Sequence, residues 1–329
     1  MQIEQILQQF SQIKALVIGD AMIDRYWWGK VNRISPEAPV PVLHLQQQQD
    51  ALGGAANVAT NLQALGATPF LCTIIGIDEG GQRLKQMMLE KGLSTDGLVE
   101  IKSRQTTIKG RMMAANQQLL RVDQEDTHDL EEEEIALLKG RIERLLEREA
   151  IQLIIFQDYN KGVLVPTLIE WVMAEAKRRG IVTAVDPKRK HFFAYKGATL
   201  FKPNLREVQE ALQQKVVVEK KGLEGAAAEL RERLGQQFTL ITLSDKGVYL
   251  ERVGEDCLAS TQPRQIADVC GAGDSVLSIA ALAIVSKLSI KITAHLSNLA
   301  GGQVCERVGV VPIAQHQLIQ DFKEWKLVE

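Results

Sequence analysis

The segment "DVCGAGDSVL" spans residues 268–277 and precedes a long run of small and apolar residues. Gly271 and Gly273 permit a tight turn with inward-pointing backbone N–H groups, and the helix expected to follow adds the positive end of its dipole. Such a turn can bind an anion. Asp274 stands at its rim, where a carboxylate could take the proton from a hydroxyl that attacks a phosphoryl group. An ordinary turn before a helix with an acidic first turn explains the motif equally well.

The position of Asp274 also predicts its acidity. A helix N-terminus stabilises an ionised carboxylate, so we expect the pKa of Asp274 to lie below its usual value. A base of that kind is weak in the ground state. It would act only as the new P–O bond forms and the attacking hydroxyl becomes more acidic.

Short apolar segments alternate with helical patterns along the chain. Strands are expected at 15–20, 69–76, 151–158, 181–186, 198–204 and 238–245, with amphipathic segments that end in glycine between them. This order predicts an α/β fold with a doubly wound, mainly parallel sheet covered by helices on both faces. Asp20, Asp158, Asp186 and Asn204 end four of these segments, on the side where such sheets bind ligands.

Two stretches break the alternation, at 21–50 and 104–123. The first contains three prolines and two adjacent tryptophans, and the second alternates as a β-strand does. Neither has a helical face to bury. We therefore expect a single domain over 1–329 whose two irregular stretches form a small β-sheet, either a lid over the ligand crevice or a pairing surface.

Composition excludes several classes of partner. The chain of 329 residues has a net charge of −2 and 5% aromatic residues, which argues against binding nucleic acid or an anionic membrane. The longest nearly apolar run, at 276–285, is about half of what a membrane-spanning helix needs. The start of the chain lacks secretory features, and four widely spaced cysteines favour reduced thiols. We expect a soluble, cytoplasmic protein.

Other phosphate-binding motifs are absent or ambiguous. No GxxxxGK[ST] occurs, and no GxGxxG follows the first strand, so a P-loop NTPase is excluded and a dinucleotide site is poorly supported. In "LGGAANVATNLQALG" Gly53 and Gly54 open a helix, and Asn57 could bind sugar hydroxyls or simply be solvated. The five histidines have no spacing suited to a metal.

A second polar pair lies in "KPNLREVQEAL", residues 202–212. Asn204 and Glu207 are three residues apart at the start of a predicted helix, where an amide and a carboxylate suit water-mediated Mg²⁺ beside phosphates. The same spacing is a helix N-terminal capping pattern. Both interpretations stay open. "FQDYNKG" adds Lys161 at another strand end, and "DPKRKHF" adds a basic cluster that includes Lys188.

Taken together, these motifs resemble a known family. "GGAANVA", "PNLRE", "TLSDKG" and "DVCGAGD", in this order and spacing, resemble the ribokinase (PfkB-type) carbohydrate kinases over nearly the whole chain. Within that family "GDAMIDRYWWGKVNRISPEAPVPV" and "NQQLLRVD" are similar to the bacterial D-glycero-β-D-manno-heptose 7-phosphate kinases of ADP-heptose synthesis.

The resemblance implies a role for each matching residue. Asp274 is the expected base, and the amides of Gly271, Ala272 and Gly273 form the anion hole. The nucleotide side comprises Asn204, Glu207, Thr242, Ser244, Gly247 and Asn298, with Glu207 reaching Mg²⁺ through water. The sugar side comprises Asp20, Asp24, Gly53, Gly54 and Asn57, and the candidates for the 7-phosphate and its surroundings are Arg25, Lys109, Arg111, Gln117, Arg121, Lys161 and Lys188. ATP and Mg²⁺ are the implied cofactors, with a monovalent cation as a further candidate, and the lid is expected to pair two subunits.

Three features depart from the resembled kinases. The bifunctional relatives continue into a nucleotidyltransferase domain, which is not expected within these 329 residues. Cys270 stands where threonine is common, and Ala115 stands where an arginine precedes "NQQ" in the resembled kinases. The Ala115 difference keeps a kinase for another sugar or sugar phosphate as an alternative. A non-catalytic regulator that binds sugar or nucleotide, and a nicotinamide dehydrogenase, are more remote alternatives.

Overall fold

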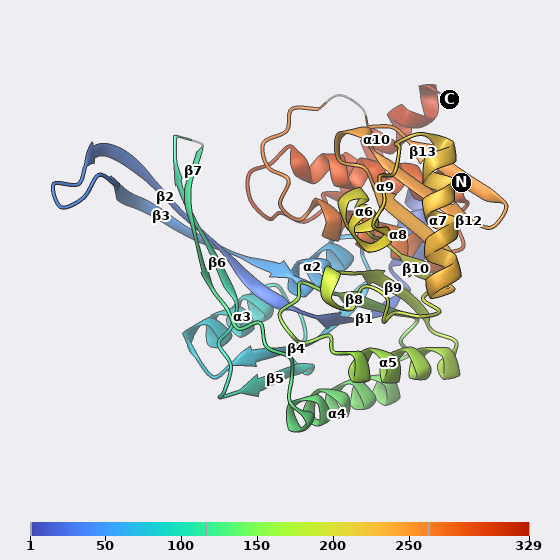
Figure 1. Cartoon of the computed structure of the whole chain (residues 1–329), viewed down its shortest axis with the longest axis horizontal. Coiled ribbons are helices and arrows are strands. Elements are labelled where there is room, and N and C mark those ends of the chain that lie inside the picture. The colour runs from blue at the N-terminus through green and yellow to red at the C-terminus, as the bar shows by residue number, and fades with distance from the viewer. Residues whose placement is uncertain (1, 116, 262–263, 329) are drawn as a thin grey trace.

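A computed structural model describes residues 2–115, 117–261 and 264–328 (Figure 1). Its strands are β1 (Lys14–Gly19), β2 (Ala21–Ile34), β3 (Pro41–Gly54), β4 (Thr68–Gly76), β5 (Leu98–Ile101), β6 (Ile108–Ala114), β7 (Gln117–Gln124), β8 (Leu153–Gln157), β9 (Val182–Asp186), β10 (Leu200–Phe201), β11 (Phe238–Thr242), β12 (Val248–Arg252) and β13 (Glu255–Ala259). Its α-helices are α1 (Ile3–Phe10), α2 (Ala55–Ala64), α3 (Glu79–Glu90), α4 (Glu132–Arg148), α5 (Pro166–Arg179), α6 (Leu205–Leu212), α7 (Lys220–Leu234), α8 (Ala272–Val285), α9 (Ile290–Cys305) and α10 (Gln315–Val328).

The strands described form a large and a small sheet. The large sheet has nine strands in the order β13-β12-β11-β10-β9-β8-β1-β4-β5. Pairing is parallel from β11 to β5 and antiparallel where β12 and β13 extend the edge. The predicted α/β class and mainly parallel sheet are confirmed. Three strands near the two ends of this sheet, β5, β12 and β13, were not predicted, because acidic residues interrupt their short sequences and leave no apolar run like that of a central strand.

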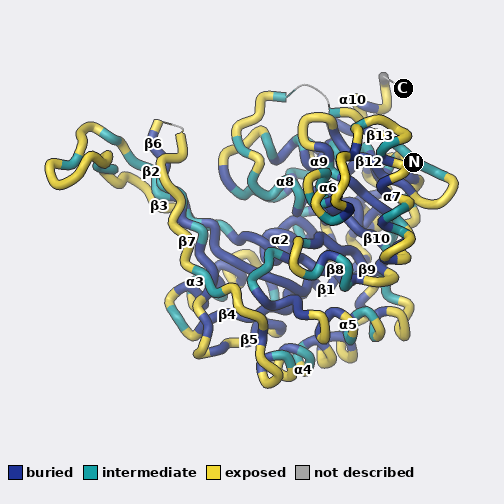
Figure 2. The backbone as a smooth tube through the Cα atoms, viewed as in Figure 1, coloured by how far each residue is buried: buried dark blue, intermediate teal, exposed yellow. Residues whose placement is uncertain are grey.

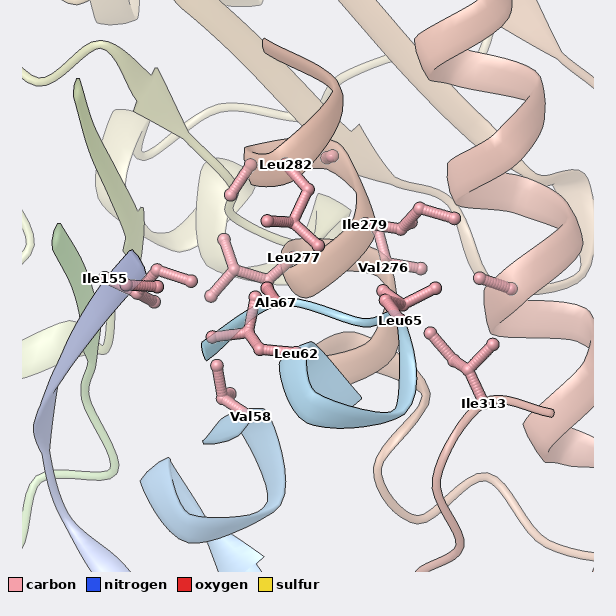
Figure 3. Packing of buried hydrophobic residues seen from close by; sticks show 14 of the residues in the cluster. Val58, Leu62, Leu65, Ala67, Ile155, Val276, Leu277, Ile279, Leu282 and Ile313 are labelled. Atoms are coloured by element: carbon pink, nitrogen blue, oxygen red, sulfur yellow. The ribbon is translucent and has the colours of Figure 1, made fainter. Parts of the chain in front are cut away.

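Helices cover both faces of the large sheet (Figure 1). Along β1, Ala15 and Val17 belong to one buried cluster, and Leu16 and Ile18 belong to the other. This alternation is the period-two pattern of a strand buried on both sides. In the first cluster Val58 and Leu62 of α2 lie beside Leu277 of α8 (Figure 3), and this packing fixes the two helices that later contribute polar groups to one site.

The small sheet has the order β3-β2-β6-β7 and projects from the main body (Figures 1 and 2). Strand β2 begins two residues after β1 ends, and β3 returns directly into α2. The predicted separate β-sheet is therefore present. Its strands differ slightly from the expected stretches, because β3 continues to Gly54 and β6 starts only at Ile108. No helix within the described residues is long and apolar enough to cross a membrane.

Gly19 sits where β1, β2 and β8 meet. A Cβ there would lie 2.0 Å from the backbone oxygen of Gln157, so we expect Gly19→Ala to lower the free energy of unfolding by more than about 1 kcal/mol. Gly140 provides the matched control, since it is exposed within α4 and a Cβ there meets nothing within 4 Å. Gly140→Ala should stabilise by about 0.5–1 kcal/mol. Urea unfolding measures both; equal effects of the two substitutions would contradict this account of the junction.

Candidate active site

Asp274 lies in the first turn of α8 and is 3% exposed. Its Oδ2 accepts a hydrogen bond from Nδ2 of Asn57 at 2.7 Å. Its Oδ1 accepts from the Tyr159 hydroxyl at 2.9 Å and from Nε2 of Gln157 at 3.1 Å. Three elements, α2, β8 with its following loop, and α8, thus converge on one carboxylate. Both oxygens are held, so the group has a fixed orientation.

The pKa of Asp274 corrects a sequence-based expectation. Burial, as the largest effect, raises it to about 7, and the charge of Asp186 acts in the same direction. The hydrogen bonds from Asn57 and Tyr159 oppose this rise. The predicted depression by the helix N-terminus is therefore wrong, because desolvation outweighs it. A carboxyl with a pKa near 7 is well matched to proton transfer at neutral pH.

The tight turn predicted from Gly271 and Gly273 is present before Asp274. Gly271 adopts a left-handed conformation with φ +81°, and a Cβ on it would lie 2.8 Å from Nδ2 of Asn57. Only glycine therefore keeps both the turn and the Asn57–Asp274 hydrogen bond. The first amides of α8 follow directly, so the positive end of the helix faces the same space.

That space is a cavity of about 960 Å³. It brings together most residues predicted for phosphate and nucleotide, namely Gly271, Ala272, Gly273, Asp274, Asn204, Thr242, Ser244, Gly247 and Asn298, together with Lys188. The sequence segments that supply them are separated by up to about a hundred residues, and the sheet places them around one opening.

Glu207 does not line this cavity. Its Oε2 accepts from the Asn204 backbone N–H at 2.8 Å, and its own N–H donates to Asn204 Oδ1 at 2.9 Å. Its Oε1 accepts from Lys188 Nζ at 2.6 Å. The capping interpretation of this pair is therefore realised at the start of α6. No cluster of three or more His, Cys, Asp and Glu side chains able to hold a metal occurs in the described part of the chain.

The predicted sugar-side residues follow the small sheet into α2. Asp24 forms an ion pair with Arg111 at 2.6 Å. A Cβ on Gly53 would lie 2.1 Å from Asp24 Oδ2, so the missing side chain leaves room for that carboxylate. Asp20 has a different position: its oxygens accept backbone N–H groups of Tyr159, Lys161 and Val163. Asp20 therefore orients the loop after β8.

Strand alternation separates the predicted phosphate-binding cations. Asp24, Lys109 and Asp123 are paired across β2, β6 and β7 and so share one face of the small sheet. On this face Tyr26 approaches Gly309 of the main body, so the face is directed inward. Arg25 occupies the opposite face and pairs with Asp50 at 2.7 Å. The position of Arg25 does not support its predicted contact with the 7-phosphate.

Lys161, Arg121 and Lys188 pair with different carboxylates. Lys161 follows β8 and pairs with Glu125 at 2.6 Å, and Lys109 approaches the same carboxylate at 3.5 Å. Arg121 is half exposed and pairs with Asp123. Lys188 lies on the nucleotide side of Asp274, as a lining residue of the cavity. Gln117 is exposed at the start of β7.

Sequence reasoning missed four residues of the site: Gln157, Tyr159 and Lys202 received no role, and Asp186 was noted only as a strand end. A signal was available for Gln157 and Tyr159, because they lie in the "FQDYNKG" segment, which was singled out for Asp158 and Lys161. In the structure Asp158 accepts from the Tyr195 hydroxyl, whereas the residues flanking it reach Asp274. A period-two reading beyond β8 would have placed Gln157 and Tyr159 on one side and Asp158 on the other.

Comparisons with known proteins identify the family of the chain. Residues 12–316 match the model of the "pfkB family carbohydrate kinase". A protein of Desulfatibacillum aliphaticivorans named "Bifunctional protein HldE" is 40% identical over 312 residues, which cover 94% of this chain and 63% of that protein. One of the same name from Geotalea uraniireducens is 38% identical over 98% of this chain and 65% of its own length. The chain therefore spans less than two thirds of the length of these relatives.

Solved structures share the fold at low sequence identity. Phosphofructokinase-2 from Escherichia coli in complex with potassium superposes with a TM-score of 0.81 at 18% identity, covering 95% of this chain and 99% of that one. Arabidopsis thaliana ribokinase complexed with ribose and ATP gives 0.71 at 17% identity, covering 94% and 98%. The family-model match and the curated relatives extend over most of the sequence, and they confirm the resemblance that its motifs suggested: the chain belongs to the pfkB family of carbohydrate kinases.

Proposed function

We propose that this kinase transfers the γ-phosphoryl group of ATP to the anomeric hydroxyl of D-glycero-β-D-manno-heptose 7-phosphate, giving the 1,7-bisphosphate. The observation that carries the chemistry is the buried carboxylate of Asp274, held by three donors beside a glycine turn. The heptose assignment rests on the resemblance of the "RISPEAPVPV" and "NQQLLRVD" segments to the heptose 7-phosphate kinases. The relatives named "Bifunctional protein HldE" support the kinase family.

The chain's own groups divide the reaction between them. Asp274 accepts the proton of the attacking hydroxyl as the γ-phosphoryl group leaves ADP. The amides of the 271–273 turn stabilise charge on the transferred phosphoryl oxygens. Asn57, Gln157 and Tyr159 keep the carboxylate aimed at the hydroxyl.

The cavity offers hard oxygen ligands that fit Mg²⁺, which neutralises phosphate charge when bound. Asp186 lines it, with Oδ2 3.8 Å from the place a Cβ of Gly273 would occupy. Glu207 is paired with Lys188 at 2.6 Å, so it would reach the ion through water or after that pair opens. The potassium in the phosphofructokinase-2 structure supports a monovalent cation as a further candidate.

Lys109 and Lys161 are the best-supported ligands for the 7-phosphate. They come from β6 and from the loop after β8, yet both approach the single carboxylate of Glu125, at 3.5 and 2.6 Å. All three side chains are mostly buried, with exposed fractions of 15%, 15% and 20%. Two mostly buried ammonium groups that converge on one anion offer a position where a phosphate monoester would fit. Arg111 is already engaged by Asp24 and lies over the Tyr26 ring.

The outer face of the small sheet supports the proposed homodimer. Leu120 and Val122 of β7 are exposed there, at 55% and 43%, and Trp27 lies on the same face against Gly110. Contiguous exposed apolar side chains on a projecting sheet are typical of a protein–protein interface. We propose that two copies pair through this face, which leaves the charged inner face toward each active site.

The sugar assignment is tested by coupled ADP release with heptose 7-phosphate and with the same heptose lacking the phosphate. We expect a clear preference for the phosphorylated sugar, and Lys161→Met should raise its KM by roughly 10–100-fold, since a hydrogen bond to a charged group is lost. The unphosphorylated sugar should show no such change. Lys85→Met, at a surface pair with Glu100, is the control.

Turnover of a different sugar alone would contradict the heptose assignment. It would direct attention to Ala115, which lies at the exposed turn after β6 with φ +47° and replaces the arginine of the resembled kinases.

The pKa of Asp274 predicts the pH dependence. Because the ionised form is the base, kcat/KM should rise with pH and level off above about 7. Tyr159→Phe removes a hydrogen bond to the ionised form, which raises the pKa of Asp274 and moves the acid limb to higher pH. Tyr195→Phe removes a buried hydroxyl that contacts Asp158 instead and should leave the limb in place. A limb that shifts equally in both variants would contradict the role of Tyr159.

A further inference from the structure

Lys202 is a buried cation that no motif assigned. It follows β10 and is 3% exposed, and its backbone N–H donates to Val185 at 2.8 Å. Its Nζ lies 2.9 Å from Asp186 Oδ2. It also lines the cavity that contains the glycine turn. A buried ammonium group is costly to desolvate, so its position requires an electrostatic reason.

The surroundings of Lys202 place it at the reacting end of this cavity. Its Nζ lies 3.6 Å from the position that a Cβ of Gly273 would occupy. Its charge acts to lower the pKa of Asp274. Nε2 of Gln157 contacts both Asp274 and Asp186, at 3.1 and 3.3 Å. Contacts through Asp186 and Gln157 thus connect the ammonium group of Lys202 to the base.

Lys188, unlike Lys202, has an acceptor in the described part of the chain for every N–H donor of its ammonium group. Its Nζ donates to Glu207, to Asp186 and to the backbone oxygen of Pro187, at 2.6, 3.3 and 3.3 Å. An ammonium group has three N–H donors, and Lys188 has an acceptor for each. Among the residues that the structure describes, Asp186 is the ion-pair partner of Lys202. That contact requires one donor and leaves two that can face the cavity.

Asp186 is contacted by ammonium groups at both of its oxygens. Lys202 Nζ lies 2.9 Å from Oδ2, and Lys188 Nζ lies 3.3 Å from Oδ1. These contacts orient Lys202 before any ligand binds. Preorganised charge of this kind stabilises a transition state without a reorganisation cost.

We propose that Lys202 contacts the γ-phosphoryl group during transfer and is a catalytic residue of this kinase. The inference rests on the proposed phosphoryl transfer. In that step the anomeric oxygen forms a bond to the γ-phosphorus, and the bond from the γ-phosphorus to the bridging oxygen breaks. The electron pair stays with ADP, and the proton passes to Asp274. Lys202 donates to the equatorial oxygens of the transferred group, as the amides of the turn do.

The γ-contact predicts a distinctive pattern in Lys202→Met. Isothermal titration in the presence of Mg²⁺ should show weaker ATP binding, by roughly 10-fold or more, and unchanged ADP binding, because ADP lacks the contacted group. With the sugar that the wild type uses, kcat should fall by about 10²–10³-fold while the KM of the sugar stays constant. Lys102→Met, at an exposed site after β5, should change neither.

A purely structural role would give a different result. Equal loss of ATP and ADP affinity, or retention of both with normal kcat, would overturn the proposal. Lys202→Gln keeps a donor for Asp186 and is the second variant, to be titrated in the same way if Lys202→Met fails to fold. The ATP and ADP titrations need no sugar, so a failed sugar assignment leaves their outcome readable. Conversely, heptose phosphorylation at wild-type rate by Lys202→Gln would exclude Lys202 and leave the proposed function standing.

Discussion

The active site depends on one carboxylate that is buried away from water and accepts hydrogen bonds from three side chains. Asp274 is stabilised by Asn57 from α2 and by Gln157 and Tyr159 from the end of β8. Each donor is fixed in turn by packing, since α2 lies against α8 and β8 is a central strand of the large sheet. Burial then raises the pKa of Asp274 to about 7, whereas the donors keep the ionised form accessible. The packing that holds α2, β8 and α8 together therefore also raises the pKa of Asp274.

Charge is arranged differently on the two sides of this carboxylate. On the cavity side Lys202, Asp186, Lys188 and Glu207 form a continuous chain of ion pairs. On the side of the small sheet Asp24 pairs with Arg111, and Lys109 and Lys161 share Glu125. Each cation already has a carboxylate partner before ligands bind. A phosphate group that binds these cations competes with a carboxylate that remains in the site, because leaving such a carboxylate buried and unpaired is costly.

The sequence could predict the large sheet and the residues around the glycine turn because both depend on local signals. Apolar runs bounded by glycine marked the central strands. Gly271 and Asn204 were predicted from short motifs, and Asn298 only from the family resemblance. Strands β12 and β13 carry weaker signals, since acidic residues interrupt their short apolar segments. The pKa of Asp274 was mispredicted for a physical reason. Helix position is visible in sequence, but the desolvation that outweighs it depends on the whole fold.

The remaining site residues depended on contacts between distant segments. Nothing in "LFKPN" shows that Lys202 lies beneath the turn at Gly273, more than seventy residues later in the chain. Likewise Arg25 and Lys109 looked equivalent as cations, and only the strand register separates them onto opposite faces of the small sheet. Register is set by pairing across the sheet, so composition alone could not distinguish the two.

The most direct measurement is the rate constant of the chemical step in a single-turnover, rapid-quench experiment with ATP, Mg²⁺ and heptose 7-phosphate. Wild type is compared with Asp274→Asn, and substrate binding is titrated separately in both. The account predicts a rate constant lower by about 10²–10⁴-fold in the variant, since general base catalysis contributes on this scale, with ATP and sugar affinities largely retained. A variant that transfers phosphate at the wild-type rate would contradict it, because Asp274 would then not be the base.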